Sequence, residues 1–93
     1  MSKVIFIDFF AEWCIPCDIQ DPIIEKLKEK YGNNVEFKKI DIDKDGEFAE
    51  KYNVSSIPML IIEKDDSIFT THVGITSLEI LVSDINKALE WTG

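Results

Sequence analysis

Cys14 and Cys17 are the two cysteines of the chain, and they lie three positions apart in the stretch AEWCIPCD. A pair with this spacing can supply half of a metal site, form a structural disulfide or act as a redox dithiol. Most of what the sequence says about function depends on which of these three interpretations is correct.

Two of the interpretations have weak support. A structural zinc site needs four ligands, and this pair would supply two of them. The chain adds His72 and many carboxylates but no second cysteine pair, so a metal would have to be bridged between two chains. A structural disulfide between residues three apart closes a very small loop, which removes little entropy from the unfolded chain. Both interpretations stay open at this point.

The position of the pair favours redox chemistry. Cys14 follows an apolar stretch, and Pro16 falls in the first turn of a helix that should begin here, where a missing N–H costs no hydrogen bond. Residues three apart share one face of a helix, so the two sulfurs can meet. The free N–H groups and partial positive charge of a helix N-terminus favour thiolate over thiol. We therefore predict that Cys14, nearer the exposed tip, attacks a disulfide and that Cys17 resolves the product.

Length and composition indicate one domain over residues 1–93. Of the 93 residues, 45% are hydrophobic and 30% are charged, which is enough for one modest core. No apolar run approaches the roughly 18 residues of a membrane-spanning helix. The opening VIFIDFFA has no cleavage site of a secretion signal, so we expect a cytoplasmic protein without membrane contact. The net charge is −8 and every basic residue is a lysine, which argues against nucleic acid as a partner.

The hydrophobic pattern predicts alternating strands and helices that can position the cysteines. Runs rich in β-branched and aromatic residues predict strands over 3–10, 35–42, 58–63 and 68–73. Helical signals cover 15–31, 46–53 and about 77–91. Gly32 should end the first helix, Thr76 and Glu79 are spaced as a capping box for the last, and KDDS should be the hairpin turn. The order β-α-β-α-β-β-α predicts an α/β fold, a four-stranded mixed sheet with helices on both faces.

The segment IDFFAEWCIPC resembles the active-site segment of the thioredoxin family, in which an acidic strand residue precedes W-C-x-P-C. The similarity continues through Pro22, KKIDID, YNVSSIPML and VGITS, in the right order and over almost the whole chain from Val4. The resemblance implies a thioredoxin-like fold without the family's N-terminal strand and helix, because the first predicted strand starts almost at Met1. The strand over 35–42 would then lie at a sheet edge, where Lys38 and Lys39 discourage pairing with another chain.

Asp8 is the one acidic residue in the otherwise apolar run of the first predicted strand. Its carboxyl either reaches water near the strand end or is buried, and burial would raise its pKa and let it relay a proton to or from Cys17. The resemblance implies the second role, with Lys39 on the adjacent strand as the partner that modulates Asp8.

The resemblance also implies a substrate-binding side. Ile57-Pro58 falls where the family has a cis-proline, whose backbone would flank the cysteines and pair with a bound peptide. Trp13, Ile15 and Ile75 would form an apolar collar for docking partners, although each could instead be an ordinary exposed apolar residue. The expected substrate-binding residues are Trp13, Ile15, Pro16, Ile57, Pro58 and Gly74.

This sequence departs from the family pattern at several positions. Ile15 stands in place of the usual glycine between the cysteines, Phe10 in place of a common tryptophan, and Asp18 in place of a common lysine after the second cysteine. These differences bear on partner choice and redox potential more than on the chemistry.

Two further features carry no predicted chemistry. The stretch DIDKDG resembles the start of an EF-hand loop, but Tyr52 stands where that loop requires a bidentate glutamate. We interpret DIDKDG as a solvated acidic turn, and His72 as a sheet residue without a catalytic role.

The sequence thus predicts a monomeric protein disulfide reductase that needs no bound cofactor and receives electrons from an upstream disulfide reductase. A glutaredoxin-like enzyme that uses glutathione is the nearest alternative, and the short N-terminus suits it. Pro16 directly before Cys17, and the lack of a Gly-Gly pair near Gly74, argue against it. A metal-binding or redox-inert interaction module is the alternative from another class, and stoichiometric zinc in the purified protein would favour it.

Overall fold

The computed structural model describes residues 3–91, and the order of their strands and helices is the predicted one. The elements are β1 (Val4–Phe10), α1 (Ile15–Tyr31), the short 3-10 helix η1 (Gly32–Asn34), β2 (Glu36–Asp41), α2 (Gly46–Lys51), β3 (Met59–Lys64), β4 (Ser67–Val73) and α3 (Leu78–Glu90).

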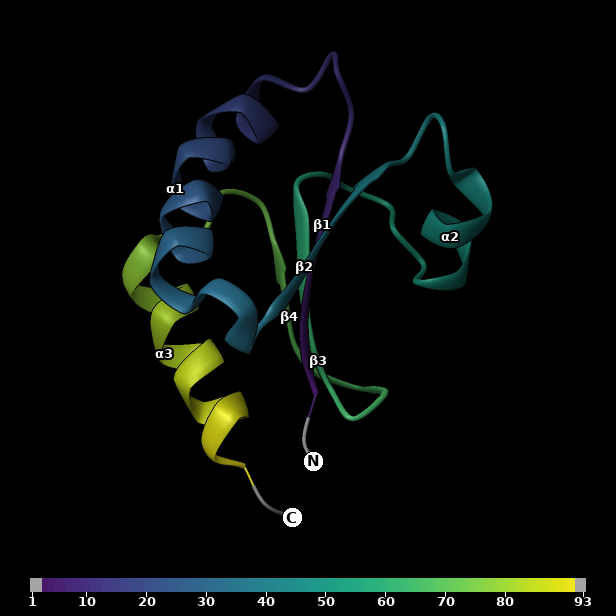
Figure 1. Ribbon diagram of the computed structural model, residues 1–93. Coiled ribbons are helices and arrows are strands. Elements are labelled where there is room, and N and C mark those ends of the chain that lie inside the picture. Colours follow the sequence, from purple (N-terminus) through teal and green to yellow (C-terminus); the bar gives the residue numbers. More distant parts are fainter. Residues whose placement is uncertain (1–2, 92–93) are drawn as a thin grey trace.

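The four strands form one mixed sheet in the order β2-β1-β3-β4. β1 and β2 are parallel, whereas β3 is antiparallel to both β1 and β4. Helices α1 and α3 lie on one face of the sheet and α2 lies on the other, as Figure 1 shows. The predicted fold class is therefore confirmed, and β2 is an edge strand within the part of the chain that the structure describes.

Because successive side chains of a strand point to opposite faces, β1 contributes to two cores. Val4 and Phe6 pack with residues of α1 and α3, while Ile5, Ile7 and Phe9 pack on the side of α2. Both faces of β1 are covered, which explains why its sequence is apolar throughout. Asp8 continues the alternation of Val4 and Phe6, so its carboxyl points toward the face that carries α1.

The predicted capping box of the last helix is wrong by one residue. Ser77 is the N-cap of α3, and its hydroxyl oxygen accepts a hydrogen bond from the Ile80 N–H at 3.3 Å. Thr76 is buried, and its hydroxyl donates to the Gly74 carbonyl at 3.1 Å. Its backbone N–H is bonded to the side chain of Gln20. These contacts hold Thr76 in the preceding loop.

The hairpin turn is also shorter than predicted. Strands β3 and β4 extend to Lys64 and from Ser67, which leaves a two-residue turn at Asp65 and Asp66. Both aspartates have positive φ, 50° and 69°. Two consecutive left-handed residues are the conformation that matches the twist of a two-residue hairpin, and aspartate tolerates it better than most residues.

Candidate active site

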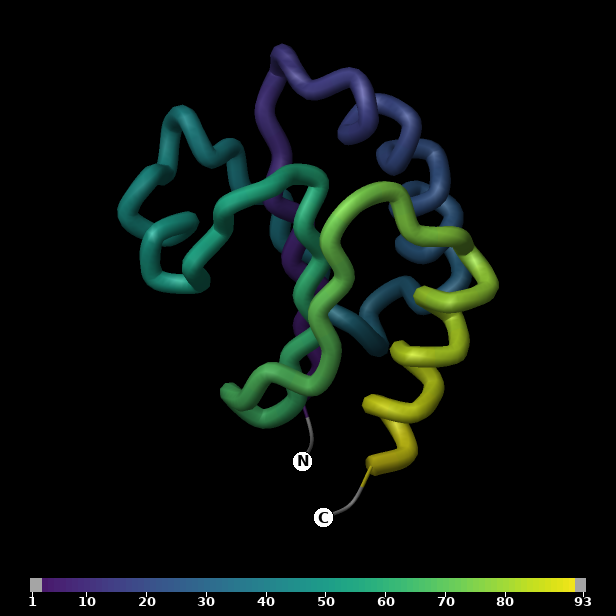
Figure 2. Tube along the Cα trace, turned by 180° about the vertical axis from the view of Figure 1, so that it is seen from behind, coloured from purple at the N-terminus to yellow at the C-terminus, as the bar shows by residue number. Residues whose placement is uncertain are grey.

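The candidate site lies at one end of the sheet, where three segments distant in sequence meet. β1 ends there, and the antiparallel pairing of β3 with β1 and β4 brings the start of β3 and the end of β4 to the same edge. Figure 2 shows the loop after β1, the segment that leads into β3 and the segment that follows β4 all toward the same end of the molecule. The topology therefore brings the cysteines, Ile57-Pro58 and Gly74 together, as the sequence predicts.

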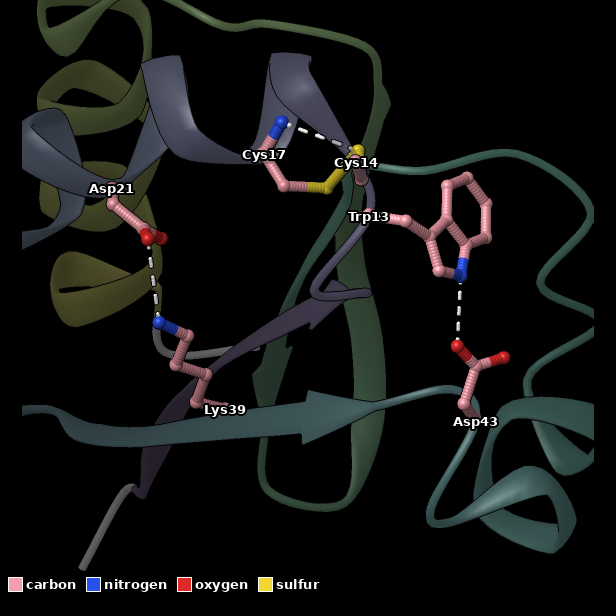
Figure 3. Close-up of a disulfide and its surroundings, with 6 residues drawn as sticks. All are labelled: Trp13, Cys14, Cys17, Asp21, Lys39 and Asp43. Atoms are coloured by element: carbon pink, nitrogen blue, oxygen red, sulfur yellow. Dashed lines mark hydrogen bonds and ion pairs between the residues drawn. A yellow bond between two sulfur atoms is a disulfide. The ribbon is translucent and has the colours of Figure 1, made fainter.

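Cys14 and Cys17 form a disulfide at the N-terminus of α1. Cys14 is the N-cap of the helix, and its sulfur accepts a hydrogen bond from the Cys17 backbone N–H at 3.2 Å (Figure 3). Cys14 is only 4% exposed and Cys17 2%, so the difference in access to solvent is smaller than the sequence suggests. Pro16 sits in the first turn and is exposed. An N–H aimed at a sulfur stabilises negative charge on it once the disulfide is reduced.

The Asp8 side chain is buried beside this helix, with 3% of the residue exposed. Burial, which disfavours the charged form, is the main cause that raises the pKa of Asp8 from 3.8 to about 6. The negative charge of Asp21 raises this pKa further, whereas Lys39 and Lys28 lower it. The predicted burial and its effect on the pKa are confirmed, and the catalytic role of Asp8 stays a prediction.

Lys39 lies opposite Asp8 in the register of β1 and β2. Its ammonium group, however, forms an ion pair with Asp21 of α1, at 3.4 Å from Nζ to Oδ2 (Figure 3). It also lies 4.6 Å from the centre of the Phe10 ring. Asp21 was missed by the sequence reasoning, and its spacing of four from Cys17 along a helix is the signal that could have placed it on the same side of α1.

The expected docking collar is exposed. Trp13 is 68% exposed, Ile15 72% and Ile75 50%. The Trp13 indole N–H donates to the Asp43 carboxylate at 2.8 Å, which fixes the ring against the segment after β2 (Figure 3). Val73 is exposed in the same way and was not predicted. Exposed apolar groups of this size around a redox-active pair are suited to contact with a partner.

The segment before β3 completes the rim. The Ile57–Pro58 peptide bond is cis, and the Pro58 carbonyl accepts a hydrogen bond from the Gly74 N–H at 2.8 Å. Ile57 packs against the two cysteines and, together with Trp13, lines a pocket of about 320 Å³. Of the residues expected to bind substrate, Trp13, Ile15 and Pro16 are exposed, Ile57 and Gly74 are half-buried, and the Pro58 side chain is buried.

Gln20 is a second residue that the sequence reasoning missed. It is fully buried on α1, where its amide nitrogen donates to the Thr76 carbonyl at 3.0 Å and its oxygen accepts from the Thr76 N–H at 2.7 Å. This pair of bonds ties the active-site helix to the loop that follows Gly74. The sequence signal that could have identified Gln20 is its spacing. It lies three positions after Cys17 and four before Ile24, which places a polar residue on the buried face of the helix.

Other groups that could carry chemistry have structural contacts. Within residues 3–91, no cluster of three or more His, Cys, Asp or Glu side chains is arranged to hold a metal ion. In the DIDKDG stretch, the Asp45 carboxylate caps α2 by accepting from the Phe48 N–H at 3.3 Å. His72 of β4 contacts Asp84 of α3. None of the helices in the described part of the chain is long and apolar enough to cross a membrane.

Comparison with known proteins agrees with this geometry. Residues 1–87 match the family model described as Thioredoxin. The thioredoxin of Bacillus subtilis is 41% identical over 86 residues, which are 92% of this chain and 83% of that protein. The thioredoxin of Chlamydia pneumoniae is 44% identical over the same length, with the same coverage. A solved structure of a mutant thioredoxin from Halobacterium salinarum superposes with a TM-score of 0.87 at 30% identity, covering 98% of this chain and 79% of that one. The chain therefore belongs to the thioredoxin family, whose members are thiol-disulfide oxidoreductases.

Proposed function

We propose that the chain reduces disulfides in proteins, with Cys14 as the attacking sulfur and Cys17 as the resolving sulfur. The observation that carries this division of roles is the hydrogen bond from the Cys17 N–H to the Cys14 sulfur at the start of α1. The helix N-terminus thus acts on Cys14, whose thiolate is stabilised more than that of Cys17, one turn further in.

The reaction transfers two electrons from the dithiol to the substrate. The Cys14 thiolate attacks one sulfur of the substrate disulfide, so that a mixed disulfide forms and the other substrate sulfur leaves as a thiolate. Cys17 then loses its proton and attacks the Cys14 sulfur. The Cys14–Cys17 bond forms, the mixed disulfide breaks, and the second substrate thiolate departs. Both thiolates take protons from water, and the chain is left in the disulfide form.

Asp8 is proposed to accept the proton of Cys17. A carboxyl whose pKa lies at about 6 can be unprotonated at neutral pH and still hold a proton long enough to pass it on. Its burial next to α1 supports this role, because Asp8 lines one pocket with residues of α1 and Cys17 is one of the buried residues of that helix. The register of β1 and β2, in which Asp8 faces Lys39, supports the proposed modulating role of Lys39.

Substrates are proposed to dock on the exposed rim. Trp13, Ile15 and Ile75 supply apolar surface, and the segment at the cis-proline Pro58 supplies backbone groups that an extended peptide can pair with. Ile57, Pro16 and Gly74 complete the surface that such a peptide would cover. We further propose that the protein acts as a monomer in the cytoplasm, carries electrons from an upstream disulfide reductase to proteins, and needs no bound cofactor.

The choice of electron donor is tested with a protein disulfide as substrate. Insulin reduction is followed with NADPH and thioredoxin reductase in one arm, and with NADPH, glutathione reductase and glutathione in the other. We expect turnover in the first arm and little in the second. The Cys14→Ser/Cys17→Ser double variant is the control for background reduction. Efficient turnover by glutathione alone would contradict the proposal and favour a glutaredoxin-like enzyme.

A further inference from the structure

We propose that Asp21 is a positioning residue for the proton chemistry at Cys17, because it holds Lys39 away from Asp8 and so keeps Asp8 able to take up a proton at neutral pH. This inference rests on the proposed role of Asp8. The Asp21 carboxylate points toward Lys39 (Figure 3), so Asp21 acts through the charges around Asp8.

The charges meet in a pocket of about 290 Å³ between α1 and β2. Asp8 lines this pocket together with five charged residues: Asp21, Glu25 and Lys28 of α1, and Lys38 and Lys39 of β2. The three helical residues are four and three positions apart, which places them on one face of α1, turned toward β2. Neither β3 nor α3 contributes a lining residue in the described part of the chain.

Each lysine of the pocket already has an acidic partner other than Asp8. Lys39 pairs with Asp21 at 3.4 Å, Lys28 with Glu25 at 3.1 Å, and Lys38 with Glu36 at 3.8 Å. Among residues 3–91, no lysine lies within ion-pair distance of the Asp8 carboxyl. The buried carboxyl of Asp8 therefore shares its pocket with three lysines but forms an ion pair with none of them.

Lys39 is the cation that matters most for Asp8. It faces Asp8 across the β1–β2 pair, and its charge lowers the pKa of Asp8 more than that of Lys28 does. Asp21 opposes it in two ways: it holds the ammonium group, and its own charge disfavours a second negative charge at Asp8. An uncharged residue at position 21 would remove both effects.

Asp21 and Lys39 are partly exposed to solvent. Their exposure limits their effect on the pKa of Asp8 and makes that effect depend on salt. The side chain of Asp21 is 39% exposed and that of Lys39 47%, so solvent and salt screen their charges. We therefore expect the influence of Asp21 on Asp8 to be modest and to weaken as ionic strength rises. A purely structural role of Asp21 would not produce that salt dependence.

The titration of the Asp8 side-chain carboxyl carbon is followed by NMR in the disulfide form, at low and at high salt. In Asp21→Asn we expect its midpoint to fall by roughly 0.5 to 1 pH unit at low salt, and by less at high salt. The control is Glu29→Gln, which removes the same charge from an exposed position about two turns further along α1. It should leave the midpoint where it is. An unchanged midpoint in Asp21→Asn would overturn the inference.

A double-variant comparison tests whether the effect runs through Lys39. Lys39→Gln should raise the midpoint, and adding Asp21→Asn to that variant should lower it by less than Asp21→Asn does alone. Equal shifts in the two backgrounds would show that Asp21 acts on Asp8 by its own charge, which contradicts the role assigned to Lys39.

Single-turnover release of substrate from a pre-formed mixed disulfide, measured from pH 5 to 9, separates this inference from the proposed function. The inflection of the wild-type rate should move down in Asp21→Asn and disappear in Asp8→Asn. A rate profile that Asp8→Asn does not change would overturn the role of Asp8, and the place of Asp21 with it. A profile that changes in Asp8→Asn but not in Asp21→Asn would overturn the place of Asp21 alone.

Discussion

The two sides of the disulfide differ in which kind of group meets water. On one side apolar side chains are exposed, and on the other the carboxyl of Asp8 is buried. Figure 3 shows the pair Trp13–Asp43 on one side of the cysteines and the pair Lys39–Asp21 on the other. Trp13 keeps most of its surface in water, which is unfavourable for the isolated chain and useful once a partner covers it. Asp8 is removed from water, which is unfavourable for its charged form.

The difference separates two tasks. In the proposed function, substrate recognition rests on side chains that a partner can cover, and proton transfer rests on a carboxyl that the fold itself covers. A substitution on the exposed side should change how well a substrate binds and leave the pH dependence unchanged. A substitution on the buried side should change the pH dependence and leave substrate affinity unchanged.

The largest effects are expected at the cysteines, where the two sides meet. Cys14→Ser should abolish reductase activity because the nucleophile is gone. Cys17→Ser should also stop turnover, but it should accumulate mixed disulfides with substrates, since no thiol resolves them. Mass spectrometry of each variant after exposure to a protein disulfide measures the adduct. If the adduct forms equally with both variants, the division of roles between the two cysteines is wrong.

Asp8→Asn should change stability in a pH-dependent way. The pKa of Asp8 is higher in the folded state than in the unfolded chain, so protonation of Asp8 favours the folded state. The free energy of unfolding therefore falls as the pH rises from 3.8 through about 6. At about 1.4 kcal/mol per tenfold change in proton affinity, a pKa moved from 3.8 to about 6 corresponds to a cost on the order of 3 kcal/mol above that range. Asparagine carries no such cost.

The measurement is the urea midpoint of the disulfide form at pH 4 and at pH 8. The stability gained by Asp8→Asn over the wild type should grow between these two values, whereas Glu29→Gln on the exposed side of α1 should show no such growth. A gain that stays constant or shrinks with pH would mean that the Asp8 carboxylate is satisfied within the fold.

How well a feature of each side could be predicted from sequence depends on how far apart in the chain the interacting residues lie. The strands and the helix at Cys14 follow from local patterns, namely alternation and the position of Pro16, whereas for Asp8 the residues left two options and the family resemblance favoured the buried role. The prediction of the strands and the helix needed only backbone geometry. The exposure of Trp13 and Ile15 follows equally from their place at the tip of a helix that opens after a strand.

The side-chain contacts around the cysteines could not be predicted from local sequence patterns. Asp21 and Lys39 are 18 positions apart, Trp13 and Asp43 are 30 apart, and Gln20 and Thr76 are 56 apart. Each depends on the side-chain conformations of two residues that the chain brings together only after folding. The misplaced cap of α3 has the same origin: Thr76 and Ser77 suit the position equally by type, and the bonds between Gln20 and Thr76 decide between them.

On the exposed side, Trp13→Ala should raise the KM for a protein disulfide by roughly five- to tenfold, the loss expected for an aromatic contact of about 1 to 1.5 kcal/mol. The kcat and its pH dependence should stay close to wild type. Trp91→Ala is the matched control, because Trp91 is 55% exposed and packs against Phe69 of β4, away from the cysteines. A change in the pH profile of Trp13→Ala would break the proposed separation of the two sides.

The smallest effect is expected at Asp18, an exposed acidic residue in the first turn of α1. Its negative charge opposes thiolate formation at the neighbouring cysteines, so it favours the disulfide and lowers the reduction potential. Replacing it by lysine reverses the charge, stabilises the thiolate of the reduced form and should raise the potential. A screened surface charge is worth about 1 kcal/mol or less, and about 1.4 kcal/mol corresponds to 30 mV.

Asp18→Lys should therefore raise the potential by no more than about 20 mV, and Asp18→Asn by about half as much. The potential is measured by equilibration with a glutathione buffer, at low and at high salt, and the shift should shrink at high salt. We expect the wild-type value near the −270 mV or so that is typical of thioredoxin, well below the roughly −180 mV of protein disulfide isomerase. The gap between those two values is several times what one surface carboxylate can supply. A wild-type potential close to that of the isomerase would therefore contradict the reductase assignment itself and could not be attributed to Asp18.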